Sequence, residues 1–257
     1  MAIRRFGAGN PLMLLNRFRG TMDDWDPALL NALARERRVI VFDSLGIGET
    51  EGEPPTSVEG SADFAAAMIV ALNLERTDIL GWSLGGEVAQ VLVLKKPELV
   101  RKMVLAATMP PGGTAEVFWS SKWLEQASAP KPSIENVISL FYTESKASRT
   151  AGFASISRMT HPPAAYVSHS AMAAQTKAIK GFGDNDSDWY SRLKEISKST
   201  FVANGDRDGL FPAIDSIVLA REISGSWLSI YPDSGHGFLF QYVDRFSEEA
   251  NRFLSDA

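Results

Sequence analysis

The 257-residue sequence contains no cysteine and only three histidines. The lack of cysteine excludes disulfides, thiolate metal sites and a cysteine nucleophile. No run of about 18 apolar residues is present, and the first residues lack the apolar region of an export signal. The net charge is −5 with no basic block, which argues against nucleic acid or a membrane surface as a partner. We therefore expect a cytoplasmic protein.

Short apolar segments alternate with helical stretches along most of the chain. The predicted strands are residues 3–6, 12–16, 38–43, 77–82, 102–106, 200–204 and 227–231. Hydrophobic residues make up 45% and charged residues 22%, as in ordinary globular proteins. Alternation of this kind predicts an α/β fold: a parallel-rich sheet of about seven strands with helices on both faces.

The alternation breaks after residue 109 and resumes only near residue 198. The intervening stretch is too long for a structureless loop, so we expect a helical cap at 110–197 inserted into a core formed by 1–109 and 198–257. The insert is rich in aromatic side chains and methionine. We expect most of these side chains to form the core of the cap, and a few to face a substrate.

The segment that carries chemistry is Gly81-Trp-Ser83-Leu-Gly85. A short apolar run precedes it, and a stretch without glycine or proline follows it from residue 87 to 96. Gly-x-Ser-x-Gly between a strand and a helix predicts a sharp turn that lifts the Ser83 hydroxyl above the carboxyl end of the sheet. The same turn directs the Leu84 N–H at this point and places a helix N-terminus behind it.

This stretch resembles the nucleophile elbow of the α/β-hydrolase family, and the chain outside the insert fits a capped, serine esterase-like member. The resemblance implies acyl transfer with Ser83 as the nucleophile. An elbow serine separates the chain from those relatives that place an aspartate there. The chain order Ser83, Asp208, His236 is also the order of this family.

His236 is the expected general base. It lies between the last strand and the last helix, at the carboxyl edge of the sheet where open parallel sheets place their sites. His161 and His169 fall within the insert, away from this edge, and we expect no catalytic role for either, with a place in the lining of the pocket as the alternative. The acid that orients His236 is expected at Asp208, because Gly205, Asp208 and Pro212 match the spacing typical of the family. Asp206 in the same loop is the alternative.

The oxyanion hole needs two N–H donors. Leu84 is expected to supply one, and Phe18, after the strand at 12–16, resembles the second donor of the family. The family usually has a His-Gly pair in this loop, where the present sequence has Asn16-Arg17. Arg17 and Arg19 are either ordinary surface charges or partners of Asp43 or Glu49 that shape the loop.

Two further patterns resemble ligand sites. Residues 46–52 imitate a dinucleotide-binding loop but lead into Pro54-Pro55 and contain two glutamates, so we expect no cofactor there. Residues 184–195 match part of a calcium loop, but Trp189 replaces its required glycine, so we expect no metal.

The sequence thus predicts a serine hydrolase that cleaves a small or medium carboxylic ester through an acyl-enzyme intermediate. Hydrolysis of a lactone or a C–C bond and cofactor-free perhydrolysis are alternatives with the same triad. A receptor that binds a small ligand in the capped pocket without turnover is an alternative from another class. The expected partner is a small ester; a homodimer is left open.

Overall fold

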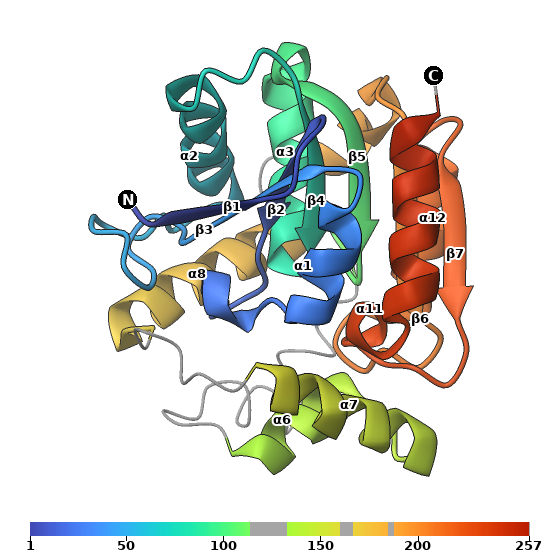
Figure 1. Cartoon of the computed structure of the whole chain (residues 1–257). Helices are drawn as coiled ribbons and strands as arrows, with labels where there is room; N and C mark the ends of the chain where they lie inside the picture. Colours follow the sequence, from blue (N-terminus) through green and yellow to red (C-terminus); the bar gives the residue numbers. More distant parts are fainter. Residues whose placement is uncertain (114–132, 160–166, 185–187, 257) are drawn as a thin grey trace.

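The computed structural model describes residues 1–113, 133–159, 167–184 and 188–256. Within these residues, seven strands form one sheet in the order β1-β3-β2-β4-β5-β6-β7 (Figure 1). The strands are β1 (Ile3–Phe6), β2 (Pro11–Leu15), β3 (Arg38–Phe42), β4 (Thr77–Trp82), β5 (Val100–Ala106), β6 (Thr200–Gly205) and β7 (Trp227–Tyr231). β1 pairs antiparallel with β3, and the other neighbours are parallel. The expected parallel-rich sheet is confirmed.

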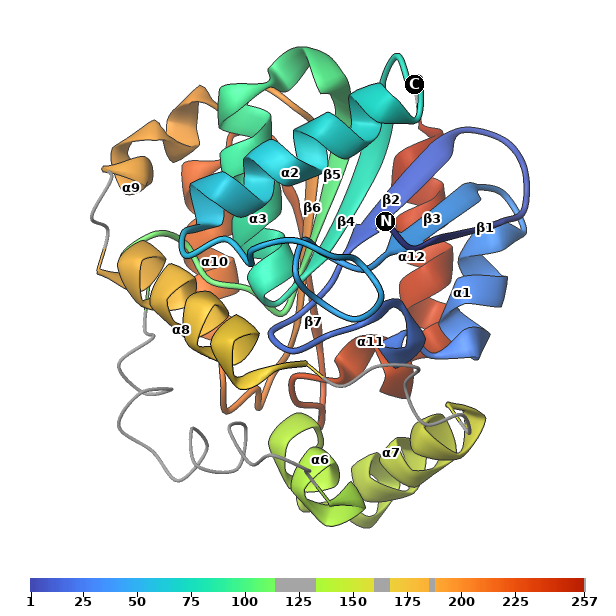
Figure 2. The same cartoon turned by 90° about the vertical axis from the view of Figure 1, so that its left-hand side faces the viewer.

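Helices cover both faces of the sheet (Figure 2). Successive strand residues point to opposite faces, so Leu12 and Leu14 belong to one apolar cluster and Met13 and Leu15 to the other. Helices α1 (Pro27–Ala34), α11 (Phe238–Gln241) and α12 (Val243–Ser255) complete the first cluster. Helices α2 (Val58–Ala71), α3 (Leu84–Lys95) and α10 (Ala213–Glu222) complete the second.

The segment between β5 and β6, called the insert below, is helical where it is described. It contains α6 (Ile134–Phe141), α7 (Lys146–Arg158), α8 (His169–Gly183), α9 (Trp189–Arg192) and the 3₁₀ turn η3 (Leu193–Glu195). Helices α6 and α7 lie beyond the carboxyl ends of the strands, in the lower part of Figure 1. Helix α8 lies against α2 and α3.

The expectation that most insert aromatics form a core of their own was wrong for the described residues. Phe182 and Trp189 belong to the cluster of α2 and α3, and Phe141 packs against the cluster on the other face. Phe153 and Tyr190 are exposed. Short insert helices gain more apolar contact by covering the existing layers than by packing on one another. Trp119, Trp123 and Tyr166 lie outside the described residues.

Helix α3 is buried along most of its length and carries two buried polar side chains. Gln90 Nε2 donates hydrogen bonds to the backbone oxygens of Gly86 (3.2 Å) and Met109 (2.9 Å). Both carboxyl oxygens of Glu87 are buried and have no partner among the described residues. Burial disfavours the charged carboxylate and raises the pKa of Glu87 well above its ordinary value.

This burial predicts a pH-dependent stability that Glu87→Gln removes. The unfolded chain loses the Glu87 proton near the ordinary pKa, whereas the folded protein keeps it to higher pH. The stability that neutral Glu87 contributes is therefore complete below the ordinary pKa and is lost as the pH rises toward the raised one. In denaturant melts from about pH 5 to pH 9, the wild type should lose up to about 1.4 kcal/mol per pH unit relative to Glu87→Gln.

The control is Glu98→Gln, because Glu98 is exposed. Its curve should run parallel to that of the wild type. Parallel curves for the wild type and Glu87→Gln would show that Glu87 ionises alike in both states.

Candidate active site

Ser83 is the single residue between β4 and α3, and its backbone is strained. Its φ of 59° and ψ of −125° fall in a region that side-chain-bearing residues rarely adopt. The turn is held by Ser83 N–H to Ala106 O (2.9 Å) and Gly86 N–H to Ser83 O (2.8 Å). Added Cβ atoms at Gly81 and Gly85 would lie 2.3 Å from Gly85 O and 2.0 Å from Leu15 O, so this turn requires glycine at both positions.

His236 and Asp208 are in direct contact. The Nδ1 atom of His236 lies 2.8 Å from Asp208 Oδ2, and both side chains are almost completely buried. The other carboxylate oxygen, Oδ1, accepts the backbone N–H groups of Leu210 (2.8 Å) and Phe211 (3.1 Å). Because Nδ1 is engaged by the carboxylate, Nε2 is the ring nitrogen left to exchange a proton.

Asp206, the alternative acid, occupies a different place. It is exposed, and its Oδ1 accepts the backbone N–H of Ser234 at 3.1 Å. The bond ties the loop after β6 to the loop that carries His236. The structure thus places Asp208, which was favoured from the family spacing, against the imidazole. Asp206 instead binds the backbone of Ser234, two positions before His236 in the sequence.

Three aromatic rings surround the imidazole of His236. The ring centroids of Trp82, Phe141 and Phe211 lie 5.7, 5.5 and 5.6 Å from that of His236. Trp82 also donates its Nε1–H to His236 O at 3.1 Å, and Gly237 N–H donates to Phe141 O at 2.8 Å. The residue before Ser83 therefore contacts His236, and Phe141 of insert helix α6 packs against both rings, with its centroid 5.6 Å from that of Trp82.

The loop expected to hold the second oxyanion donor, residues 16–20, is called the oxyanion loop below. Asn16 Nδ2 donates to Thr21 O (2.5 Å), and Asn16 Oδ1 accepts the N–H of Arg17 (2.8 Å). Gly20 N–H donates to Arg17 O (3.0 Å). Asn16 thus holds both ends of a loop that lacks the His-Gly pair. The N–H groups of Phe18 and Leu84 donate to no group among the described residues.

Arg17 connects this loop to the aromatic rings around His236. Its Nη1 donates to Phe18 O and its Nη2 to Asp24 Oδ1, both at 2.7 Å. Its guanidinium carbon lies 5.5 Å from the ring centroid of Trp82 and 5.2 Å from that of Phe141. At these distances a guanidinium is attracted to the ring faces.

Arg17 is neither an ordinary surface charge nor the partner of Asp43 or Glu49, which was the alternative; it is largely buried and pairs with Asp24. Asp43 accepts the backbone N–H groups of Met22 (2.7 Å) and Glu49 (2.9 Å) instead. A carboxylate that already receives two backbone donors is well satisfied, so the arginine pairs with the nearer Asp24.

Gln175 of α8 is a contact that the sequence did not predict. Its Oε1 accepts the N–H of Arg19, in the oxyanion loop, at 2.9 Å. The two residues lie 156 positions apart, and no pattern in the sequence relates them. Burial lowers the pKa of the Arg19 guanidinium.

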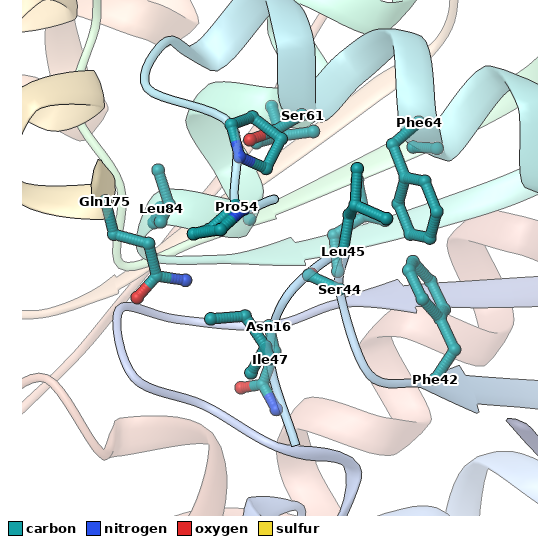
Figure 3. Close-up of a pocket in the computed structure, with 15 residues that line it drawn as sticks. Asn16, Phe42, Ser44, Leu45, Ile47, Pro54, Ser61, Phe64, Leu84 and Gln175 are labelled. Carbon is teal, nitrogen blue, oxygen red and sulfur yellow. The ribbon is translucent and has the colours of Figure 1, made fainter. Parts of the chain in front are cut away.

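Two cavities adjoin these residues. The first, of about 30 Å³, runs from Leu84 and Gln175 to Phe42 and Phe64 (Figure 3). Its wall is formed by Leu15, Asn16, Phe42, Ser44, Leu45, Ile47, Pro54, Pro55, Ser61, Phe64, Ala65, Leu84, Gly85, Val88 and Gln175. The second, of about 160 Å³, is bounded by Arg17, Asp23, Asp24, Trp82, Ile134, Val137, Phe141, Tyr142, Ile156, Met159 and Phe240.

Of the remaining candidate residues, those that the structure describes do not join this site. His169 is exposed at the start of α8, and His161 lies outside the described residues. The glycine-rich stretch at 46–52 closes a turn through Gly46 N–H to Thr50 O at 3.1 Å. Within the described ranges, no group of three His, Cys, Asp or Glu side chains is placed to hold a metal ion. None of the helices in those ranges has the length and apolar character needed to cross a bilayer.

Comparisons with known proteins agree with this architecture. A 2-hydroxymuconate semialdehyde hydrolase of Pseudomonas sp. strain CF600 is 25% identical over 260 residues, which span 98% of this chain and 89% of that protein. A poly(3-hydroxyalkanoate) depolymerase of Ectopseudomonas oleovorans is 29% identical, spanning 95% of this chain and 84% of that protein. The solved α/β hydrolase fold protein from Chitinophaga pinensis has a TM-score of 0.89 and 28% identity, and the match covers 99% of this chain and 93% of that one.

These relatives support an enzyme of the hydrolase class. The family model described as alpha/beta hydrolase fold matches residues 10–241, which include the elbow, the insert and both loops that meet at His236. With this match over most of its length and with the sheet described above, the chain belongs to the α/β hydrolase fold family.

Proposed function

We propose that this protein is a serine hydrolase that cleaves a small carboxylic ester through an acyl-enzyme intermediate. The observation that carries the proposal is the 2.8 Å contact between His236 Nδ1 and Asp208 at the edge where Ser83 occupies a strained turn. A serine hydroxyl needs an adjacent base to become a nucleophile, and that base needs a group that fixes its tautomer.

In the proposed reaction, Ser83 Oγ attacks the ester carbonyl carbon while its proton passes to His236 Nε2. The carbonyl oxygen becomes an oxyanion and accepts the N–H groups of Phe18 and Leu84. When the C–O bond to the alcohol breaks, His236 returns the proton to the leaving alcohol. Water then attacks the acyl-enzyme, giving its proton to His236, and the acid departs as Ser83 regains a proton.

The environment of the N–H donors favours this role. Neither Phe18 N–H nor Leu84 N–H has a partner among the described residues. Leu84 is also the first residue of α3, whose positive dipole end favours negative charge at this position. Donors fixed in place before the reaction are worth about 3–4 kcal/mol each in related chemistry.

The wall of the smaller cavity favours an uncharged acyl group. The cavity of Figure 3 adjoins Leu84, and none of its described lining residues is Lys or Arg. At about 30 Å³ it has room for only a few carbon atoms. We assign it to the acyl chain and assign the larger cavity beside Trp82 to the alcohol.

Hydrolysis of a C–C bond is the second candidate, because one relative is named for 2-hydroxymuconate semialdehyde hydrolysis and spans 98% of this chain. The same triad would also serve the hydrolysis of a C–C bond, the hydrolysis of a lactone, and cofactor-free perhydrolysis. The acyl cavity has no Lys or Arg among its described lining residues, which favours an uncharged acyl group over an anionic one there. Turnover of 2-hydroxymuconate semialdehyde faster than that of p-nitrophenyl butyrate would reverse this order. A small ligand that stabilises the protein without turnover would instead favour the receptor.

Ser83→Ala should abolish ester hydrolysis, with kcat falling by at least about 10⁴-fold, because no other nucleophile occupies the elbow. Intact mass after exposure to a fluorophosphonate should show one adduct on the wild type and none on Ser83→Ala. Ser170→Ala, an exposed serine on α8, is the control and should label like the wild type. An adduct on Ser83→Ala would refute the nucleophile assignment.

Asp208→Asn should lower kcat by about 10⁴-fold, since the amide no longer holds the imidazole in the tautomer that accepts the serine proton. Asp206→Asn is the matched control in the same loop and should stay within about tenfold of the wild type. Both are measured as kcat for p-nitrophenyl butyrate. The reverse ranking would make Asp206 the acid.

Ester preference should follow the size of the acyl cavity. We expect kcat/KM for p-nitrophenyl acetate, propionate and butyrate to exceed that for the octanoate by at least about tenfold. Phe64→Ala should raise the octanoate value relative to butyrate, because Phe64 lies at the far end of the cavity from Leu84 (Figure 3). Val70→Ala, an exposed change on the same helix, should leave the ratio unchanged. An equal preference in the wild type would place the acyl chain elsewhere.

A further inference from the structure

We propose that Gln175, on insert helix α8, is a positioning residue for the oxyanion hole. This inference rests on the proposed function and adds to it: the insert aligns the Phe18 N–H, in addition to covering the site. Gln175 acts through the peptide between Phe18 and Arg19 and does not itself contact the reacting atoms.

The first step concerns the peptide group that contains the Phe18 N–H and the peptide groups before and after it. The Arg17 N–H is held by Asn16 Oδ1 (2.8 Å), and Arg17 O accepts the N–H of Gly20 (3.0 Å). The next peptide is held at both ends: Phe18 O accepts Arg17 Nη1 (2.7 Å), and Arg19 N–H donates to Gln175 Oε1 (2.9 Å). Of these donors, Phe18 N–H alone has no partner among the described residues; its direction is set by Arg17 O, the acceptor of its own peptide group, and by the tethered peptide groups before and after it.

The second step concerns strain. Arg19 has a φ of 59°, a left-handed conformation that is unfavourable for a residue with a long side chain. Such strain costs about 1–3 kcal/mol and persists only where the surroundings hold it. The hydrogen bond from Arg19 N–H to Gln175 comes from outside the loop, whereas Asn16 and Arg17 belong to it.

The third step concerns the rigidity of the acceptor. Gln175 has 9% of its surface exposed and lies among Met172, Ala178 and Ile179, which join the apolar cluster of α2 and α3. Figure 3 shows its side chain extending from α8 into the cavity that Asn16 and Leu84 also line. The acceptor is therefore fixed to the helix that begins at the nucleophile. Both donors of the oxyanion hole are therefore connected to α3. Leu84 is its first residue, and the Phe18 N–H is connected to it through Gln175 and α8.

We infer that removing the acceptor leaves the Phe18–Arg19 peptide held at Phe18 O alone and lets the backbone of Arg19 shift from its left-handed conformation. The Phe18 N–H then turns away from the oxyanion, while Phe42, Phe64 and Leu84 still line the acyl cavity and a side chain of similar length stands at position 175. Because the donor acts on the oxyanion and not on the ground-state ester, kcat should fall and KM should change little.

The test uses Gln175→Met, which keeps the length of the side chain and removes the acceptor, and Gln175→Glu, which keeps an oxygen acceptor. Lys177→Met is the matched control on the exposed side of the same helix. kcat and KM are measured for p-nitrophenyl butyrate. The concentration of active sites is determined by complete titration with a fluorophosphonate, so that misfolded protein does not lower the value of kcat. Thermal melts are recorded alongside.

A second readout isolates the oxyanion hole. With phenylboronic acid, Ser83 Oγ adds to boron, the hydroxyl proton passes to His236, and the boron becomes a tetrahedral anion that occupies the hole. Butyrate, the product, serves as the ligand that forms no such adduct. A positioning defect should weaken inhibition by the boronic acid and leave inhibition by butyrate unchanged.

We expect Gln175→Met to lower kcat by about 10- to 100-fold, less than the full loss of one donor, with KM within about twofold. The Ki of phenylboronic acid should rise by a similar factor, whereas Gln175→Glu and Lys177→Met should stay within about fivefold of the wild type in kcat. The inference is overturned if Gln175→Met retains wild-type kcat, if Gln175→Glu falls equally far, or if KM alone changes. A wild type that neither labels nor hydrolyses esters would instead refute the proposed function, and this inference with it.

Discussion

The conformation of Ser83 is the constraint on which the rest of the structure depends. A φ of 59° at a serine is held because Gly81 and Gly85 let the turn, the start of α3 and the end of β2 approach within distances that a Cβ would forbid. The turn also requires β5 beside it, since the Ser83 N–H is satisfied by Ala106 O. The central strands and α3 thus fix the position of Ser83 without any contribution from the insert.

Everything else at the site is brought to that point from the carboxyl ends of other strands. The loop after β6 presents Asp208, the loop after β7 presents His236, and the loop after β2 presents Phe18. In a parallel sheet these ends share one edge, which is why Trp82 and His236, 154 positions apart in sequence, become neighbours. The imidazole is then enclosed by Trp82, next to the serine, and by Phe141 of the insert.

The insert contributes more contacts with the core than its sequence indicates. Its described aromatic residues extend the apolar clusters of the sheet, and Gln175 joins α8 to the oxyanion loop. Arg17 makes a second connection, from Phe18 O to the faces of Trp82 and Phe141. On our proposals, an insert so attached lines the acyl cavity and aligns the transition-state donor, so that substrate choice and rate would depend on the same packing.

The sequence by itself determined the parts that local chemistry specifies. The alternation of apolar runs with helical stretches predicted the sheet, and Gly-x-Ser-x-Gly predicted the turn at Ser83, because strand and elbow patterns are written in consecutive residues. Family spacing favoured Asp208, and the fold brings that carboxylate to His236. The tertiary structure alone decided that Arg17 pairs with Asp24, that Gln175 reaches Arg19, and that Glu87 is buried without a described partner. Those contacts join segments far apart in the chain or depend on which side of a helix is covered, and a single sequence carries no periodic signal for either.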